Sequence, residues 1–232
     1  MAYDASALPD VSGLTVGIIG GTGDQGRGLA YRLARAGQRV LIGSRSAARA
    51  SQVAEEIAAL PGLPADPTVS GGDNAEVSSR SDVVIIAVPW DGHRDTVAAL
   101  REPLAGKVVI DCVNPLGFDK QGPYPLRVEE GSAVQQAAAL LPESRVCSAF
   151  NHVSAPLLAD PGIDRIDLDV LICTEERELV GLVAALAARI PGMRGIYAGR
   201  LRNAHQVEAF TANLIAINKR YKAHAGLRVT DL

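Results

Sequence analysis

The sequence has few cysteines, few lysines and few aromatic residues, and it has no long hydrophobic run. Its 232 residues include three cysteines, Cys112, Cys147 and Cys173, in three separate predicted strands. An odd and unclustered set argues against a disulfide framework and against a zinc site, so we expect buried thiols in a reducing cytoplasm and no metal. No apolar run reaches the roughly 18 residues that a membrane-spanning helix needs.

The charge is low and nearly balanced. The 23 basic and 26 acidic residues leave a net charge of −3, which gives no global attraction to nucleic acid or to a membrane surface. Only four of the basic residues are lysines, so arginine is common and no single arginine is significant by itself. The first 12 residues contain no basic or apolar signal-peptide region, and we expect them to be a disordered or loosely packed lead-in.

Apolar runs alternate with helical patterns through residues 13–150. Residues 83–88 and 108–113 are nearly continuous apolar runs, as expected of parallel strands covered on both faces. The alternation predicts a Rossmann-type, doubly wound parallel α/β sheet. Strands are expected at residues 15–20, 39–43, 82–88, 107–113 and 145–150, and more weakly at 68–70. Helices are expected at 25–36, 47–59, 74–79, 91–100 and 132–140, and loops at 61–67 and 115–125.

The pattern changes after residue 150. A loop leads to an expected strand at 169–174, a helix at 175–190, a strand at 193–198 and a long helix at about 201–221. We therefore expect a lead-in (1–12), a nucleotide-type domain (13–150) and a small C-terminal α/β domain (151–232) that closes one side of a cleft. The long helix carries a broad apolar surface, so we also expect a homodimer. The apolar residues are Phe210, Leu214, Ile215 and Ile217.

A glycine-rich segment, GTGDQG, stands between the first predicted strand and the first predicted helix. It matches the G-x-G-x-x-G pattern, whose glycines allow a tight turn, close approach of a pyrophosphate and close packing of helix on strand. The helix N-terminus then offers unpaired N–H groups to phosphates. An ordinary β–α turn is the alternative, but the strand and helix around the motif favour a dinucleotide. The expected contacts are Gly21, Thr22, Gly23, Asp24, Gln25 and Gly26.

The second predicted strand ends in Gly43-Ser44-Arg45, about 20 residues past the glycines, where an NAD site carries an acid for the ribose hydroxyl. Ser44 can donate to a 2′-phosphate, and Arg45 can supply a charged donor pair and stack on adenine. Arg49 lies one helical turn further and can join them. The sequence therefore predicts NADP(H) as the cofactor of residues 13–150, and the alternative is a solvated arginine on a loop.

Several segments together resemble one family. They are GGTGDQGRGLAYRLARAGQRVLIGSR, AVPWDGH, VIDCVNPLGF, HVSAPLL, AGRLRNAHQVE and LIAINKRYKAHAGLRVTDL. They are similar to the F420H2:NADP oxidoreductases, also called NADPH-dependent F420 reductases, above all to the actinobacterial branch. The resemblance implies direct hydride transfer between C4 of NADP(H) and C5 of the 8-hydroxy-5-deazaflavin coenzyme F420. Because both partners are hydride carriers, no catalytic side chain is required.

Three strand ends are expected to hold the two rings, since ligands of such sheets lie beyond the carboxyl ends of the strands. The resemblance implies that the third end lines the deazaflavin pocket, with Asn151 where relatives usually have His. Asn cannot carry charge, so a proton-donor role at Asn151 is in doubt. His152 is a possible substitute or a structural residue, and Trp90 is a ring contact or a core anchor. The residues are Val88, Pro89 and Trp90; Asn114, Pro115 and Leu116; and Asn151, His152 and Val153.

Other functions stay open at this point. An NADPH-dependent reductase of an imine or carbonyl substrate would need a proton donor near the cleft, such as His152 or Tyr124. A non-catalytic NADP-sensing protein would bind the nucleotide without turnover. The basic run Lys219, Arg220, Lys222 and His224 would suit the phosphate and polyglutamate tail that the family's deazaflavin carries, or it is a solvated helix end that meets the negative end of the helix dipole.

Overall fold

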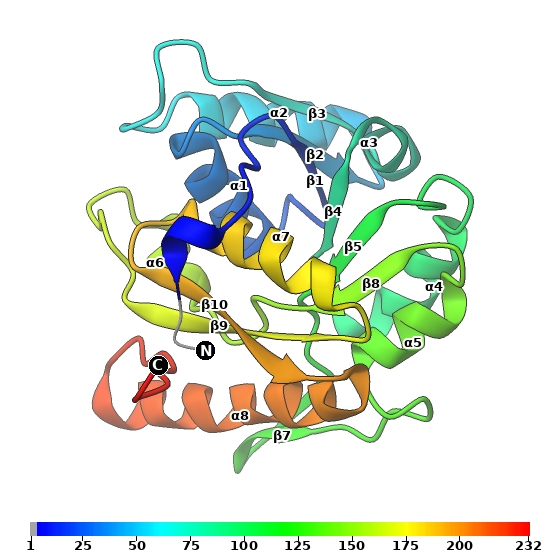
Figure 1. Cartoon of the computed structure of the whole chain (residues 1–232), viewed down its shortest axis with the longest axis vertical. Helices are drawn as coiled ribbons and strands as arrows, with labels where there is room; N and C mark the ends of the chain where they lie inside the picture. Colours follow the sequence, from blue (N-terminus) through cyan, green and yellow to red (C-terminus); the bar gives the residue numbers. More distant parts are fainter. Residues whose placement is uncertain (1–3) are drawn as a thin grey trace.

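The computed structural model describes residues 4–232, which form one eight-stranded sheet with helices on both faces (Figure 1). The predicted doubly wound α/β class is confirmed. The strands of this sheet are β1 Thr15–Ile19, β2 Arg39–Ser44, β3 Val69–Asp73, β4 Val83–Ile86, β5 Val108–Asp111, β8 Arg145–Ser148, β9 Leu168–Thr174 and β10 Met193–Gly199. The helices are α1 Asp24–Arg35, α2 Ala47–Ala58, α3 Asn74–Arg80, α4 His93–Ala99, α5 Ala133–Leu140, α6 Ala155–Ala159, α7 Arg177–Ala188 and α8 Ala204–Tyr221, with single 3-10 turns η1 Ala5–Ala7, η2 Trp90–Gly92 and η3 Leu201–Asn203.

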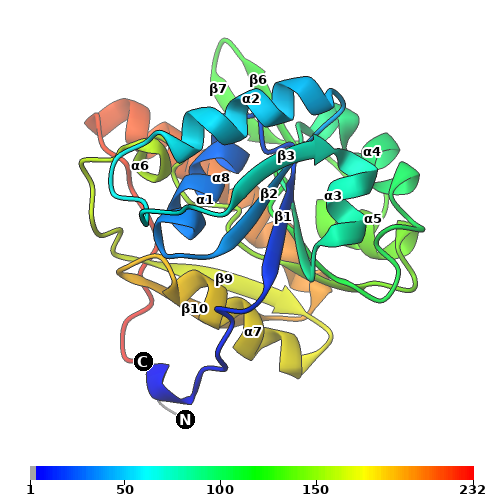
Figure 2. The same cartoon turned by 90° about the horizontal axis from the view of Figure 1, so that it is seen from above.

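Both faces of the sheet are covered, which explains the continuous apolar runs. In β4, Val83 and Ile85 belong to a core shared with α1, α2 and α7, whereas Val84 and Ile86 belong to a core shared with α4 and α5. Figure 2 shows α3, α4 and α5 gathered on one side of the sheet. Successive residues of a strand point to opposite faces, so a strand covered on both sides needs an apolar residue at nearly every position.

Short polar side chains fix where several helices begin. Ser46 accepts a hydrogen bond from the main-chain N–H of Arg49 at the start of α2 (3.3 Å). Asp73 accepts one from Glu76 at the start of α3 (2.8 Å). Such caps satisfy N–H groups that have no partner inside the helix. The turn before α1 differs, because its N-cap is Gly23, which has no side chain to occupy those groups.

The strand order reverses between β1 and β4. The order is β10-β9-β8-β5-β4-β1-β2-β3, so the chain moves outward from β1 to β3 and then returns to pair β4 with the other side of β1. Ligands of open α/β sheets bind beyond the carboxyl ends of the strands at such a switch point. Gly20, Ser44 and Ala87, which end or follow β1, β2 and β4, therefore mark the place where a site is expected.

Strands β9 and β10 extend this same sheet. β9 runs antiparallel to β8, with Cys147 opposite Thr174, and β10 runs parallel to β9. The sheet is therefore mostly parallel, with one reversal that the sequence analysis does not anticipate. A parallel pair needs a crossover segment, usually a helix of some length, and the connection from β8 to β9 holds only the five-residue α6. Residue 150 thus does not separate two sheets, and the division into two domains stays a prediction.

One further segment differs from expectation. Residues 115–125, expected as a loop, contain the hairpin of β6 Leu116–Asp119 and β7 Gly122–Pro125, and β7 lies beside α8 (Figure 1). In the described part of the lead-in, Val11 is buried and its carbonyl accepts a hydrogen bond from Gln38 (2.9 Å), whereas Asp4, Ser6 and Ala7 are exposed. Residues 1–3 of the lead-in lie outside the described residues. Across residues 4–232, none of the helices has the length and apolar character needed to span a bilayer.

Candidate functional site

A first cavity, of about 850 Å³, lies beyond the carboxyl ends of β1, β2 and β4. It contains most of the residues that the sequence predicts for the nucleotide. Its lining is Gly20, Thr22, Gly23, Asp24, Gln25, Ser44, Arg45, Ser46, Arg49, Asn74, Ala87, Val88, Pro89, Gly92 and Thr96. The N-terminus of α1 opens toward it without a side-chain cap, so the first-turn N–H groups remain available to an anion.

The glycines of the turn have different tasks. A Cβ on Gly26 would lie 2.7 Å from the carbonyl oxygen of Gly20, and one on Gly21 would lie 2.8 Å from that of Ile18. Neither glycine lines the cavity. Gly26 lets α1 pack closely on the turn that follows β1, and Gly21 lets this turn lie close to β1 and to Ile42 of β2. Gly20 itself has φ +78°, and its Cβ would lie 2.6 Å from the carbonyl of Ala87. Gly20 lies one residue before the G-x-G-x-x-G pattern, so the pattern does not include it. The pair Gly20-Gly21 is the feature of the sequence that marks this position.

The end of β2 presents the expected basic group. Arg45 and Arg49 are exposed and both line the first cavity, together with Ser44. The lining also includes residues that the sequence does not predict, among them Ser46, whose hydroxyl caps α2, and Asn74 at the start of α3. The Asn74 side-chain oxygen is buried and has no hydrogen-bond partner. Asn74 therefore brings an acceptor oxygen without a partner to the same cavity lining as the two arginines.

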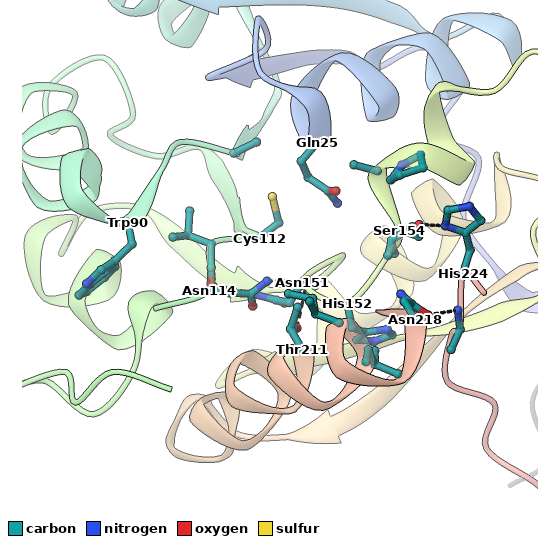
Figure 3. Close-up of a pocket in the computed structure, with 18 of the residues that line it drawn as sticks. Gln25, Trp90, Cys112, Asn114, Asn151, His152, Ser154, Thr211, Asn218 and His224 are labelled. Atoms are coloured by element: carbon teal, nitrogen blue, oxygen red, sulfur yellow. Dashed lines mark hydrogen bonds between the residues drawn. The ribbon is translucent and has the colours of Figure 1, made fainter. Parts of the chain in front are cut away.

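A second cavity, of about 730 Å³, lies beyond the ends of β5 and β8 and against α8 (Figure 3). Three strand-end segments and α8 form its walls. Its lining is Gln25, Ala87, Val88, Pro89, Trp90, Cys112, Val113, Asn114, Asn151, His152, Val153, Ser154, Ala155, Pro156, Thr211, Leu214, Ile215, Asn218, Lys222, Ala223, His224 and Ala225. Burial raises the pKa of the Cys112 thiol, so this cysteine offers no thiolate to the cavity.

Hydrogen bonds lock Asn151 into the cavity wall. Its side-chain oxygen accepts from the Ser148 hydroxyl (2.8 Å), and its amide donates to the Val113 carbonyl (3.2 Å). Its main-chain oxygen accepts from the Asn114 amide (2.6 Å) and from the Thr211 hydroxyl (3.3 Å). One residue thus ties together the ends of β5 and β8 and the helix α8. Both of its oxygens are used for this purpose, and its uncharged amide is not an acid that could protonate a ring.

His152 is a neutral, buried side chain. Its Nε2 accepts a hydrogen bond from the main-chain N–H of Leu171 (3.3 Å), which assigns the ring proton to Nδ1. Burial lowers the pKa of His152 to about 4. Nδ1 is buried and has no partner, and so is the side-chain oxygen of Asn114. Neither Asn151 nor His152, the two predicted positions at the end of β8, therefore brings a charged proton donor to the second cavity.

The two cavities share part of their walls. Gln25, Ala87, Val88 and Pro89 line both. Gln25 lies in the first turn of α1, and Val88 and Pro89 follow β4, so the switch point of the sheet is where the cavities meet. Two ligands in these cavities would lie next to each other at this shared wall.

Other predicted residues lie elsewhere. Pro115 lines a separate cavity of about 270 Å³ beside Glu208, and Leu116 begins β6 without lining either main cavity. Tyr124 packs over Gly117 in the hairpin and lines neither main cavity. Leu214 and Ile215, expected on an outer apolar surface, line the second cavity instead. Of that surface only Phe210 and Ile217 are exposed, each by 37%.

A buried polar cluster behind Trp90 was not foreseen. His93 is fully buried, with Nε2 2.6 Å from the Asp111 carboxylate and Nδ1 2.9 Å from the Gln136 side-chain oxygen. Burial alone would lower the pKa of His93, but the charge of Asp111 and these hydrogen bonds outweigh it, and the pKa is raised. Trp90 stacks on His93, with 5.5 Å between ring centroids. Trp90 is thus both a cavity residue and a packed one.

Glu208 of α8 completes this region. Its carboxylate accepts hydrogen bonds from the main-chain N–H groups of Ala133 (2.9 Å) and Val134 (3.2 Å) at the start of α5. Burial is the largest influence and raises the pKa of Glu208 to about 7. A lone His or Glu in a helix carries no sequence pattern, so no signal in the chain identifies this cluster.

The chain resembles known proteins along most of its length. The family model described as NADP oxidoreductase, coenzyme F420-dependent, matches residues 15–115. The F420-dependent NADP reductase of Methanothermobacter thermautotrophicus is 38% identical over 224 residues, which cover 94% of this chain and 96% of the relative. That of Methanocaldococcus jannaschii is 37% identical over 227 residues, which cover 94% and 99%.

A solved structure is similar to this chain in both fold and sequence. A protein from Arthrobacter sp. FB24, described as a candidate F420-dependent NADP-reductase, superimposes with a TM-score of 0.76 at 26% identity and covers 94% of this chain and 100% of its own. The similarity in fold therefore accompanies a similarity in sequence that extends over both strand-end cavities. The chain belongs to the family of the F420-dependent NADP reductases.

Proposed function

We propose that this protein is an oxidoreductase that transfers a hydride directly between NADP(H) and coenzyme F420. The observation that carries the proposal is the pair of adjoining cavities, which share Gln25, Ala87, Val88 and Pro89. One cavity has the chemistry for a phosphorylated nucleotide, and the other has a mostly uncharged lining, with Lys222 as a cationic member, that suits a flat ring. Family membership supports the choice of the second partner.

The first cavity would hold NADP(H). The uncapped N-terminus of α1 would receive the pyrophosphate, and Arg45 and Arg49 would bind the 2′-phosphate with charge-assisted hydrogen bonds. The unpartnered oxygen of Asn74 is a ready acceptor for a ribose hydroxyl. Aspartate or glutamate at the end of β2 would repel the 2′-phosphate, and none occupies positions 43–45.

The second cavity would hold the deazaflavin ring. When bound, the nicotinamide and the deazaflavin supply the hydride chemistry themselves. The chain then has to position two flat groups and exclude water. Asn151 fixes the cavity wall through four hydrogen bonds, and the neutral His152 adds no charge that would attract water.

Two other functions have less support. A reductase of an imine or carbonyl substrate needs a proton donor, but Tyr124 lines neither cavity and His152 is buried and neutral. A protein that only senses NADP has no use for a second cavity of this size beside the first. Neither alternative explains the shared wall.

An isotope experiment tests the proposal. Purified protein is mixed with oxidised coenzyme F420 and NADPH that carries deuterium at C4 on the transferring face. We expect bleaching of the deazaflavin absorption and deuterium at C5 of the product. Absence of bleaching with intact NADPH binding would contradict the proposal and favour the sensing alternative, and deuterium in water would contradict direct transfer.

We further propose a cytoplasmic homodimer. The three cysteines are free and buried, as suits a reducing compartment, and Phe210 and Ile217 leave an apolar strip exposed on α8. Light scattering coupled to gel filtration tests the subunit number. A monomer at micromolar concentration would contradict the dimer.

A further inference from the structure

The end of the chain forms part of the wall of the second cavity. Residues 223–229 follow α8, and we call them the C-terminal strap. Ala223, His224 and Ala225 line the cavity, and His224 Nδ1 lies 3.3 Å from the Ser154 hydroxyl on the opposite rim (Figure 3). The strap therefore spans the space between the end of α8 and the segment that follows β8.

The strap is held at its first end by α8. Lys222 adopts the left-handed conformation with φ 51°, which ends the helix. The Asn218 side chain then accepts a hydrogen bond from the main-chain N–H of Ala225 (2.6 Å), and its main-chain oxygen accepts one from Ala223 (3.2 Å). Asn218 also lines the cavity (Figure 3). The direction of the strap is therefore set where it leaves the helix.

Asp169 holds the other end of the C-terminal strap. Its fully buried carboxylate accepts from the main-chain N–H of Val229 (2.6 Å) and from Arg228 (3.2 Å), both in the strap. Arg194 binds the same carboxylate at 2.7 and 2.8 Å and also donates to the Val229 carbonyl (3.0 Å). The Asp169 N–H donates to the Leu227 carbonyl (2.8 Å). Burial alone would raise the pKa of Asp169, but the bonds from Arg194 and Val229 outweigh it and hold the pKa below its ordinary value.

The reversal of β9 explains why this carboxylate is near the cavity. β9 runs antiparallel to β8, so the start of β9 lies at the sheet edge where β8 ends. Leu171, two residues after Asp169, bonds to His152 in the cavity wall (3.3 Å). Asp169 thus connects the strap to the strand that supports His152.

We infer that Asp169 is a positioning residue for the second substrate, because it fixes the C-terminal strap as a wall of the second cavity. Asp169 does not line either main cavity, so it acts through the strap. Loss of this anchor displaces His224 and Ala225 while the first cavity, on the other side of the shared wall, keeps its shape. The inference rests on the proposed function for the identity of the substrate.

The test compares variants of the full chain. Asp169→Asn keeps the shape of the side chain and removes its charge, and Arg228→Gln removes one partner from the strap side. Arg145→Gln is the matched control, because Arg145 forms an ion pair with Glu176 (2.7 Å) at the start of β8 and is 38% exposed, against 43% for Arg228. We expect Asp169→Asn to raise both the KM and the Kd for F420 by on the order of 10- to 100-fold, because the displaced strap would no longer position the bound ring. We expect the KM for NADPH to change less than about 2-fold, which separates the two substrates.

Arg228→Gln should act in the same direction by a smaller factor, and Arg145→Gln should leave both constants unchanged. If Asp169→Asn does not fold, Arg228→Gln decides the question. Equal changes for both substrates, or no change for F420, would overturn the inference.

Hydrogen exchange separates this inference from the proposed function. In the ligand-free protein, Asp169→Asn should speed exchange of the Ala225 and Val229 amides by about tenfold or more, since their bonds open locally. A wild-type chain that neither binds nor reduces F420 contradicts the proposed function alone, and unchanged exchange of these two amides contradicts the anchoring role of Asp169.

Discussion

The side chain of Gln25 donates a hydrogen bond to the main-chain carbonyl of Phe150 (3.2 Å). This bond joins the glycine-rich turn of the first cavity to the end of β8 in the second. Phe150 is 1% exposed and has φ 63°, a conformation that bulky residues rarely adopt and that the surrounding packing has to enforce. The turn of the chain at Phe150 precedes Asn151 and His152, so the bond from Gln25 helps to hold both side chains in the cavity wall.

Arg45→Ala should impair the use of NADPH and not that of NADH. A charge-assisted bond to a phosphate contributes roughly 1.5–3 kcal/mol, so the KM for NADPH should rise about 10- to 100-fold. Steady-state kinetics with both nucleotides measure this. Arg39→Ala, an exposed arginine at the opposite end of β2, should change neither constant, and equal losses with NADH would show that Arg45 does not recognise the phosphate.

Gly20→Ala should destabilise the protein. The residue has φ +78°, and its Cβ would lie 2.6 Å from the Ala87 carbonyl. The conformational cost alone is about 1–3 kcal/mol, so the free energy of unfolding in urea should fall by at least about 2 kcal/mol. Gly13→Ala is the control, because nothing lies within 4 Å of its Cβ. Equal stability of the two variants would refute the assignment of strain to Gly20.

Asn151→Ala and His152→Ala should slow turnover without abolishing it. If these residues only position the ring, each loss should be on the order of 10- to 100-fold, far below the loss of a catalytic nucleophile. Because burial lowers the pKa of His152 to about 4, the turnover of the wild type should show no ionisation of His152 between about pH 6 and 8. Asn213→Ala, exposed on α8, is the control. A million-fold loss from either substitution would instead mean acid–base or covalent chemistry.

Glu208→Gln should change how stability depends on pH. The pKa of Glu208 is raised from 4.5 to about 7 in the folded chain, so the folded chain binds this proton more tightly than the unfolded chain. The resulting stabilisation is complete below pH 4.5 and is lost as the pH rises to about 7. Relative to the variant, the wild type should lose about 2–4 kcal/mol over this range.

Urea unfolding at several pH values measures this difference. The contribution of His152 is common to both proteins, whereas the charge of Glu208 also raises the pKa of His93, so the measured difference includes the coupling between Glu208 and His93. Glu129→Gln, an exposed carboxyl in the loop before α5, should leave the pH dependence unchanged. Parallel curves for wild type and Glu208→Gln would refute the raised pKa.

Much of the fold can be read from local patterns. The apolar runs at 83–86 and 108–110 identify β4 and β5 because both faces of those strands are buried. The hairpin β6–β7 cannot be predicted from its local sequence, because Pro123, Pro125 and two glycines are typical of loops. The hairpin exists because it packs against α8, a contact between segments that are distant in the sequence.

The residues of the site also fall into two groups, those that a local motif predicts and those that only the packing of distant segments brings together. Arg45 and the glycine turn can be predicted because each motif is contiguous, and the turn requires particular residues at fixed spacing. His93 and Asp111 cannot, because the pair forms only when α4 packs against β5, and neither residue has a pattern around it. Asp169 likewise gains its role from a strand reversal and from residues 60 positions later.

The shared wall of Val88 and Pro89 has a consequence for chemical design. The first and second cavities adjoin there, so one compound could occupy both if it joined an adenosine 2′-phosphate to a planar heterocycle. Linking two binding groups makes the second binding event intramolecular, and a linker of suitable length can raise affinity by about 10²–10⁴ over either group alone. Such a bisubstrate inhibitor would discriminate against enzymes that bind the same nucleotide but have no ring-sized hollow beside it.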